Sequence, residues 1–213
     1  MSSPANLSCG LVLLAAGAST RMGRPKQLLP MYGNRPLLRH VAESALAGPV
    51  SPVIVVLGAN ATEVAPCLAG LPLQIVINAE WVEGMGASLR CGMEALIATS
   101  PSIQSVIVAL ADQPDLPTGH LARLIETQHN TGQPIVASEC EGVRGPPVLF
   151  TAKYFRSMRA LRGDAGARVL LKTHAEDVTT VPLAATRDLD TPTDYAKYLE
   201  LNAPRVDADK DTV

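Results

Sequence analysis

The stretch LVLLAAGASTRMGRPKQLLP, residues Leu11–Pro30, decides the fold class of this chain. Its first five residues, Leu11–Ala15, form an unbroken apolar run, which is typical of a strand buried on both faces. A small-residue segment with Gly17 follows, and then three cations precede the next apolar residues. A buried strand that opens into a glycine-containing basic loop indicates an α/β protein with an anion-binding site at the strand's carboxyl end.

The rest of the chain alternates apolar runs with segments of helical period. Strands are expected at residues 52–57, 73–77, 105–111, 134–138, 147–150 and 178–181, and helices at 35–47, 61–69, 86–98, 118–129, 152–161, 165–174 and 191–201. Thr118 and Asp164 are the expected N-caps of two of these helices. Alternating strands and helices, with strands that are apolar throughout, predict a mainly parallel sheet covered on both faces.

The composition predicts one domain with a large core. The chain has 213 residues, of which 47% are hydrophobic and 18% are charged. We expect a single domain over residues 9–202, with flexible termini at residues 1–8 and 203–213. A net charge of −2 without a long basic run argues against a nucleic-acid partner.

Cysteine usage and hydropathy predict a cytoplasmic protein. Four cysteines occur without a CxxC pair, and we expect them to be buried and reduced: Cys9, Cys67, Cys91 and Cys140. No basic segment leads into an apolar one as in a secretory signal, and the apolar runs are much shorter than the roughly 20 residues that span a bilayer. We therefore expect a soluble, cytoplasmic protein with no membrane partner.

The basic loop matches neither common nucleotide-binding fingerprint. Five residues separate Gly17 from Gly23, and Lys26 does not follow Gly23 directly, so the loop is not a Walker A motif. A complete GxGxxG is also missing. From the residues alone, the loop either binds the phosphates of a nucleoside triphosphate or is a solvated basic turn.

Six segments, in chain order, resemble motifs of the MobA-like NTP transferase family. They are LAAGASTRMGRPKQLL, NAEWVEGMGASLRCG (Asn78–Gly92), LADQPDL (Leu110–Leu116), GVRGPPVLF (Gly142–Phe150), LRGDAGARVLL (Leu161–Leu171) and DLDTPTDY (Asp188–Tyr195). The resemblance covers about Leu11–Leu199, and the nearest branch is that of the molybdenum cofactor cytidylyltransferases. It implies a three-layer α/β/α sandwich with a Rossmann-like sheet, and transfer of CMP from CTP to the terminal phosphate of molybdopterin. Pyrophosphate would leave, and the cytosine dinucleotide cofactor would form.

The resemblance also implies the nucleotide site. Its residues would be Leu14, Ala15, Ala16, Gly17, Ser19, Arg21 and Lys26. Lys26 would contact the α-phosphate region and Arg21 the outer phosphates, and both would act in catalysis together with Asp112. The acceptor phosphate is already ionised at neutral pH, so no strong base is needed, and we interpret all four histidines as surface or packing residues. The methyl group of Ala16 favours CTP over GTP, by roughly 1–3 kcal/mol for one methyl contact.

Asp112 is the candidate metal ligand because it stands where the strand at 105–111 ends. From its position alone it is either a magnesium ligand or a turn or N-cap residue, since Gln113-Pro114 follows. The resemblance favours Mg²⁺, with Asp190 as the second ligand. Asp188 and Asp194 are alternatives for that second ligand, and Asp115 is interpreted as a turn residue.

The acceptor site implied by the resemblance consists of Gly84, Met85, Gly86, Ser88 and Arg168. The alternative for the glycine-rich segment is ordinary capping and packing, and for Arg168 a salt bridge on a helix. One residue departs from the family pattern: Pro146 stands where the family has histidine, which removes a hydrogen-bond donor and puts the acceptor in question.

Other functions remain open at this stage. The same chemistry could use GTP or a different phosphorylated acceptor. A non-catalytic accessory protein, which carries the cofactor to a molybdenum hydroxylase client, is a hypothesis of another class. The presence of both Asp112 and Asp190 favours catalysis, and a nicotinamide dehydrogenase is the weakest alternative because GxGxxG is incomplete.

Overall fold

A seven-stranded sheet forms the centre of the computed structural model, which describes residues 8–164, 166–184 and 187–202. The strands lie in the order β3-β2-β1-β4-β6-β5-β7. Their bounds are β1 Cys9–Ala15, β2 Val53–Leu57, β3 Gln74–Ile77, β4 Ser105–Leu110, β5 Ile135–Cys140, β6 Val143–Thr151 and β7 Val178–Pro182. Every neighbouring pair is parallel except the two pairs that contain β6. The prediction of a mainly parallel sheet is therefore confirmed.

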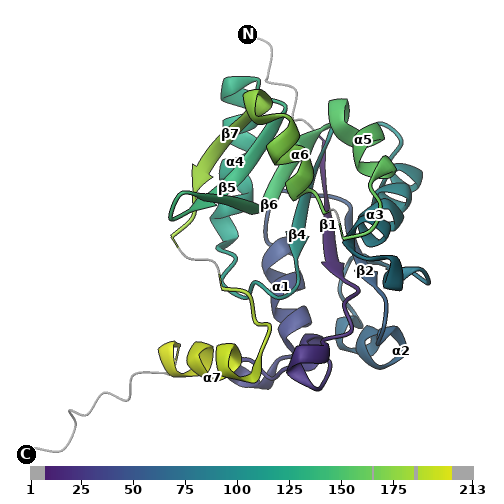
Figure 1. Cartoon of the computed structure of the whole chain (residues 1–213), viewed down its shortest axis with the longest axis vertical. Helices are drawn as coiled ribbons and strands as arrows, with labels where there is room; N and C mark the ends of the chain where they lie inside the picture. The colour runs from purple at the N-terminus through teal and green to yellow at the C-terminus, as the bar shows by residue number, and fades with distance from the viewer. Residues whose placement is uncertain (1–7, 165, 185–186, 203–213) are drawn as a thin grey trace, which may run out of the picture.

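Helices cover both faces of this sheet, as Figure 1 shows. They are α1 Leu37–Leu46, α2 Ala61–Val64, α3 Met85–Thr99, α4 Thr118–Thr131, α5 Phe155–Ala160, α6 Arg168–Thr173 and α7 Pro192–Leu201. One hydrophobic core holds Leu11 and Leu13 of β1 with residues of α1, α2, α4 and α7, and the other holds Val12 and Leu14 with residues of α3, α5 and α6. Successive side chains of β1 thus enter opposite cores, which explains why its sequence is apolar without alternation.

The topology brings the loops after β1 and β4 to the same edge of the sheet. Leu14 pairs with Leu110 at the carboxyl ends of the two parallel strands, and the N–H of Ala111 donates to the Leu14 carbonyl at 3.1 Å. The last helix, α7, lies beside the loop region that follows β1 (Figure 1), where the Tyr195 hydroxyl donates to the Pro30 carbonyl. Residues far apart in the chain therefore meet at this edge.

Several predicted boundaries were wrong for physical reasons. The helix predicted at residues 61–69 ends as an α-helix at Val64 and continues as a 3₁₀ turn over Ala65–Leu68, because Pro66 lacks the N–H of a regular helix. The strand predicted at 147–150 begins earlier, at Val143, and runs through both prolines. Proline is tolerated there because β6 is bulged at its pairing with β5, where the register shifts between Ala137 and Ser138.

Both predicted N-caps are also wrong. Thr118 is already the first helical residue of α4, and Pro117 is the N-cap. Asp164 precedes α6 by several residues, because its carbonyl accepts from the N–H of Gly166 at 2.9 Å and makes a turn first. Ala167 is the N-cap of α6.

The remaining expectations concern the termini and the cysteines. Of the segments expected to be flexible, 1–8 and 203–213, all but Ser8 lie outside the described residues, and the Ser8 carbonyl accepts from the N–H groups of Gln104 and Ser105. All four cysteines are free. Only Cys9 is buried, so the expected burial is wrong for Cys67, Cys91 and Cys140. Within the described residues, no helix is both long and apolar enough to cross a membrane.

Candidate active site

Lys26, Asp112 and Asp190 meet at the carboxyl edge of the sheet. The Lys26 ammonium donates to Asp112 Oδ2 at 2.6 Å and to Asp190 Oδ1 at 2.8 Å. Arg21 donates to the other oxygen of Asp190 at 2.9 Å. The side chains of Lys26 and Asp112 are 17% and 18% exposed, whereas Arg21 is 69% exposed. The structure thus brings together the four charged residues that the sequence singled out, with Lys26 innermost and Arg21 outermost.

The loop after β1 holds Lys26 through its own hydrogen bonds. Gln27, which is buried, donates from its amide to the carbonyls of Ala15 at 2.9 Å and Gly17 at 3.0 Å. The Ser19 hydroxyl accepts from the Lys26 N–H at 3.1 Å and donates to Gln27 Oε1 at 3.2 Å. Ser19, expected at the nucleotide, therefore acts first as a brace that fixes the backbone of Lys26.

Backbone contacts explain why Asp190 faces Asp112. The carbonyl of Asp112 accepts from the N–H of Leu189 at 3.0 Å, and Asp190 directly precedes Thr191, the N-cap of α7. Asp194 belongs to the capping box of α7, where its carboxylate accepts from the Thr191 N–H at 2.8 Å. Of the three acids considered as second ligand, Asp190 is thus the one that shares a cationic partner with Asp112.

The electrostatics of the site follow from partial burial. Burial raises the pKa of Asp112, and the Lys26 ammonium counteracts only part of that rise. Burial alone would also raise the pKa of Asp190, but the hydrogen bonds and charges of Lys26 and Arg21 outweigh it and lower that pKa. For Lys26, burial disfavours the ammonium, yet the two carboxylates prevail and raise its pKa. Lys26 therefore stays charged at neutral pH.

The two carboxylates fit a divalent metal ion. Both converge on one cationic group, and Asp112 Oδ1 is buried without a hydrogen-bond partner among the described residues. Carboxylate oxygens are the ligands that Mg²⁺ prefers, typically one or two of them together with phosphate oxygens and water. In the part of the chain that the structure describes, no group of three His, Cys, Asp or Glu side chains could hold a metal. A metal here would thus need ligands from substrate or water.

The residues expected beside the nucleobase are mostly buried. Leu14, Ala15 and Ala16 are 7–8% exposed. The Ala16 methyl group packs against Gly58, where an added Cβ would lie only 2.8 Å from it. Gly17 differs, because it is exposed and a Cβ there would meet no protein atom within 4 Å. Gly17 is therefore a position where a ligand can approach the loop backbone.

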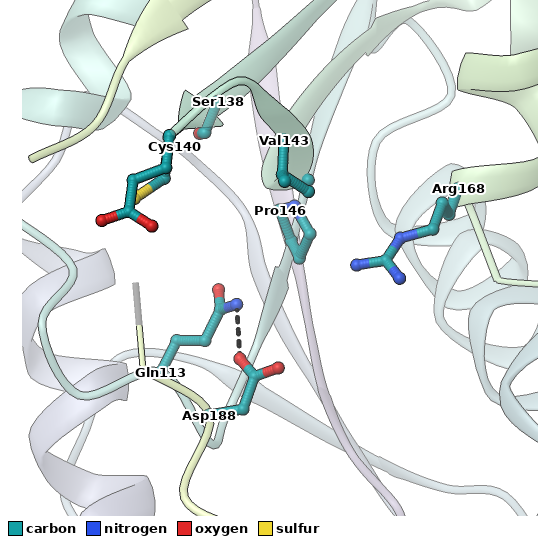
Figure 2. Close-up of a pocket in the computed structure, with 9 residues that line it drawn as sticks. Gln113, Ser138, Cys140, Val143, Pro146, Arg168 and Asp188 are labelled. Carbon is teal, nitrogen blue, oxygen red and sulfur yellow. Dashed lines mark hydrogen bonds between the residues drawn. The ribbon is translucent and has the colours of Figure 1, made fainter. Parts of the chain in front are cut away.

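A pocket of about 330 Å³ lies at the same edge of the sheet, and two of its lining residues are close in sequence to the charged cluster. Figure 2 shows Arg168 facing Pro146 across it, with Gln113 and Asp188 joined by a hydrogen bond of 2.9 Å. Its lining residues are Gln113, Ser138, Cys140, Glu141, Val143, Gly145, Pro146, Arg168 and Asp188. Gln113 follows Asp112 directly, and Asp188 is two residues before Asp190, so the pocket adjoins the paired carboxylates.

Among the predicted acceptor residues, Arg168 lines this pocket and the other four do not. Met85 lies against Gly166, and the N–H of Gly86 donates to the carbonyl of Gly163 at 2.9 Å. A Cβ on Gly84 or Gly86 would collide with residues 162–164. Ser88 is buried and accepts from the Asn78 amide at 3.0 Å. The glycine-rich segment thus packs against the loop that leads to Arg168.

The sequence did not predict most of the residues that line the pocket, nor the role of Gln27 in fixing the loop after β1. Gln27 had a weak signal, because it is a polar residue between Lys26 and the apolar pair Leu28 and Leu29. Gln113 is adjacent to Asp112, which could have drawn attention to it. Apart from Pro146, the pocket residues of the β5–β6 hairpin had no local signal, since their approach to Arg168 and Asp188 depends on the pairing of distant segments.

A buried network of hydrogen bonds links the β5–β6 hairpin to α4. The Ser138 hydroxyl donates to the Pro147 carbonyl at 2.6 Å and lies 2.7 Å from His120 Nε2. Because its one proton goes to Pro147, Ser138 accepts from His120 Nε2–H, and His120 Nδ1 accepts from Arg123 at 2.9 Å. His120 is fully buried, as a packing residue should be, and burial lowers its pKa to about 4.

Comparison with known proteins agrees with this fold. The model of the MobA-like NTP transferase domain matches residues 11–178. Nicotine blue oxidoreductase of Paenarthrobacter nicotinovorans is 39% identical over 170 residues, which are 76% of this chain and 80% of that protein. Purine catabolism protein PucB of Bacillus subtilis is 31% identical over 200 residues, 86% of this chain and 92% of that protein.

A solved structure also resembles this chain over nearly its whole length. Rv0371c of Mycobacterium tuberculosis H37Rv superposes with a TM-score of 0.80 and 28% identity, over 92% of this chain and 99% of that one. The same protein in complex with manganese gives a TM-score of 0.76 and 29% identity, over 91% and 98% of the two chains.

Proposed function

Since this chain belongs to the MobA-like NTP transferase family, we propose that it is a cytidylyltransferase that transfers CMP from CTP to the terminal phosphate of molybdopterin. The observation that carries the proposal is the convergence of Lys26, Asp112 and Asp190 at the carboxyl ends of β1 and β4. Cations next to paired carboxylates are what a phosphoryl-transfer site needs, because negative charge must be both bound and neutralised there.

The proposed reaction exchanges one phosphoanhydride bond for another. An oxygen of the acceptor phosphate forms a bond to the α-phosphorus of CTP, and the bond from that phosphorus to the β-phosphate oxygen breaks. Pyrophosphate leaves with the electron pair, and no proton has to move because the acceptor oxygen is already ionised. Lys26 holds the α-phosphate, and the exposed Arg21 holds the outer phosphates. The role of these residues is therefore to orient and neutralise the phosphates.

We assign the metal site to Asp112 and Asp190, with Mg²⁺ as the expected cofactor. The ion would neutralise charge that develops on the leaving pyrophosphate. The manganese complex of Rv0371c supports the use of a divalent metal by this fold. The two carboxylates orient toward one point, and no third acid joins them among the described residues, so phosphate oxygens would complete the site.

The Gly17 backbone and the Arg168 pocket are the proposed contacts for the two substrates. The preference for CTP rests on the resemblance of LAAG to the cytidylyltransferase motif, and Ala16 acts through the loop backbone because its methyl group is covered by Gly58. The acceptor body lies in the pocket between Arg168 and the β5–β6 hairpin, where Arg168 is the cationic lining residue. Pro146 contributes a wall to that pocket but no donor.

A second candidate function is a redox reaction. The name of the relative at 39% identity, nicotine blue oxidoreductase, favours it. The charged cluster argues for phosphoryl transfer instead, because hydride transfer needs no paired carboxylates with a lysine between them.

The deciding test is pyrophosphate release with Mg²⁺ and molybdenum-loaded molybdopterin, measured with CTP, GTP, ATP and UTP. We expect turnover with CTP and little with the other three. Release with GTP alone would overturn the base assignment and keep the chemistry. No release with any nucleotide, together with oxidation of NADH or NADPH by a dye substrate, would replace the proposal with the redox function.

A further inference from the structure

The ammonium group of Lys26 lies between the carboxylates of Asp112 and Asp190, in the position that a metal cation shared by both would take. Its ammonium contacts one oxygen of each carboxylate, at 2.6 and 2.8 Å, and Arg21 takes the second oxygen of Asp190. The fourth oxygen, Asp112 Oδ1, is buried without a partner among the described residues. A metal ion that uses both carboxylates must therefore bind within a few ångströms of the Lys26 ammonium, which already contacts one oxygen of each.

An ammonium group and a divalent ion compete for the charge of these two carboxylates. A lysine ammonium has donors only and no lone pair, so it cannot become a metal ligand. Two like charges within a few ångströms also repel strongly, and the low exposure of Lys26 and Asp112 limits screening by water. The presence of one cation consequently weakens the binding of the other.

We propose that Lys26 competes with the divalent cation for Asp112 and Asp190. Without nucleotide, Lys26 keeps the affinity for the cation low. A nucleoside triphosphate provides phosphate oxygens that draw the ammonium away from the carboxylates, and so it admits the ion. The inference rests on the proposed function for the identity of that nucleotide, and linkage requires that the metal strengthen nucleotide binding by the same factor.

The structure allows this exchange by movement of one side chain. Ser19 holds the backbone N–H of Lys26, and Gln27 fixes the loop to β1, so the loop can stay in place. The four-carbon stem of lysine is flexible and carries a compact charge. Arg21, by contrast, reaches Asp190 from solvent and is 69% exposed, so its removal should affect the metal much less.

The test is the binding of Mn²⁺ to the full chain without nucleotide, followed by electron paramagnetic resonance. We expect Lys26→Met to bind Mn²⁺ at least about tenfold more tightly than the wild type, because one charge in contact with both carboxylates is removed. Arg21→Met is the matched control, since it removes the same charge from the rim of the same site, and it should change the affinity by less than about threefold. Lys26→Gln provides a second variant that keeps a hydrogen-bond donor.

Saturating CTP gives the second readout. It should raise the Mn²⁺ affinity of the wild type by at least about tenfold and that of Lys26→Met by much less. Equal or weaker Mn²⁺ binding in both Lys26 variants, or an equal gain in Arg21→Met, would overturn the competition. If the Lys26 effect appears but no pyrophosphate is released from CTP, the proposed function fails and the competition stands. If CTP turns over but the Lys26 effect is absent, the reverse holds.

Discussion

The loop after β1 and the β5–β6 hairpin lie at the same edge of the sheet but are held in different ways. The loop is held by residues close to one another in the chain, as in the bonds from Gln27 to Ala15 and Gly17. The hairpin makes a pocket only with residues from other segments, among them Arg168 and the bonded pair Gln113 and Asp188, which are 75 positions apart. In the proposed assignment, the region that binds the nucleotide is thus built from residues close in the chain, and the region that binds the acceptor is assembled from distant segments.

The largest effect should come from the charged cluster that joins the two regions. Asp112→Asn should lower pyrophosphate release with Mg²⁺ by at least about 10³-fold. The variant removes the charge of Asp112, which is both the proposed metal ligand and the main partner of Lys26. The amide has the same shape, and the fold should remain. Steady-state kinetics and circular dichroism measure the two quantities.

Asp115→Asn is the matched control for that variant. Asp115 lies three residues further in the same loop and pairs with Arg187 instead of Lys26. Its variant should keep turnover within about tenfold of the wild type. Near-normal turnover of Asp112→Asn would contradict the assignment of the metal site to Asp112.

The charged cluster also shows which parts of the site can be predicted from the sequence. The apolar runs predict the sheet, and the cations of the loop predict a phosphate site, because both signals are contained within a few residues. Asp190 could be assigned only through the family resemblance. Its position near Asp112 depends on the backbone hydrogen bond from the Leu189 N–H to the Asp112 carbonyl, and no spacing or periodicity in the sequence predicts that bond.

The pocket was not predictable for a related reason. The strand predicted from the sequence begins at the second of two prolines, Pro147, whereas β6 includes both prolines and pairs with β5 across a register shift. Residues such as Cys140 and Val143 acquire their place only through that pairing. The glycines at 84 and 86 have a positional requirement that the neighbouring 162–164 segment imposes, because an added Cβ would collide with it.

The second prediction concerns the support of the hairpin by His120. Burial lowers the folded-state pKa of His120 to about 4 from its ordinary value of 6.5. Above about pH 6.5 both states hold the ring neutral, so the group adds no pH dependence. As the pH falls below that value, the unfolded chain binds a proton that the folded chain refuses. The free energy of unfolding should therefore fall by about 2 kcal/mol by pH 5.

Urea unfolding of the wild type and of His120→Gln between about pH 7.5 and 5 checks this prediction. The variant lacks the titrating group. Over that range its free energy of unfolding should therefore fall by about 2 kcal/mol less than that of the wild type. Parallel curves for the two proteins would show that His120 does not carry the acid sensitivity, and would weaken the view that the hairpin depends on this buried network.

The third prediction tests the assignment of the pocket to the acceptor. Arg168→Gln should raise the KM for the phosphorylated acceptor by about tenfold, the usual cost of one charge-assisted hydrogen bond, and leave the KM for CTP unchanged. Arg162→Gln is the control, because its guanidinium bonds to the backbone carbonyls of Arg159 and Leu161. A rise in the KM for CTP instead would place Arg168 with the nucleotide and merge the two regions into one.

The smallest expected effect belongs to the loop itself. Gly17→Ala should weaken CTP binding several-fold, because its Cβ would occupy space that a ligand needs, while no protein atom lies within 4 Å of it. Thermal unfolding should be unchanged for the same reason. Gly58→Ala makes the matched comparison, since its Cβ would lie 2.5 Å from the Ala16 carbonyl oxygen, and overpacking of this kind costs about 1–3 kcal/mol.

These two glycines separate a ligand's requirement from the fold's requirement. Isothermal titration with CTP and thermal unfolding should respond in opposite ways, with Gly17→Ala losing affinity and Gly58→Ala losing stability. If Gly17→Ala instead lowers the unfolding temperature and binds CTP normally, the glycine serves the loop alone. The nucleotide would then have to lie against another part of the edge, and the local character of this region would describe its folding rather than its function.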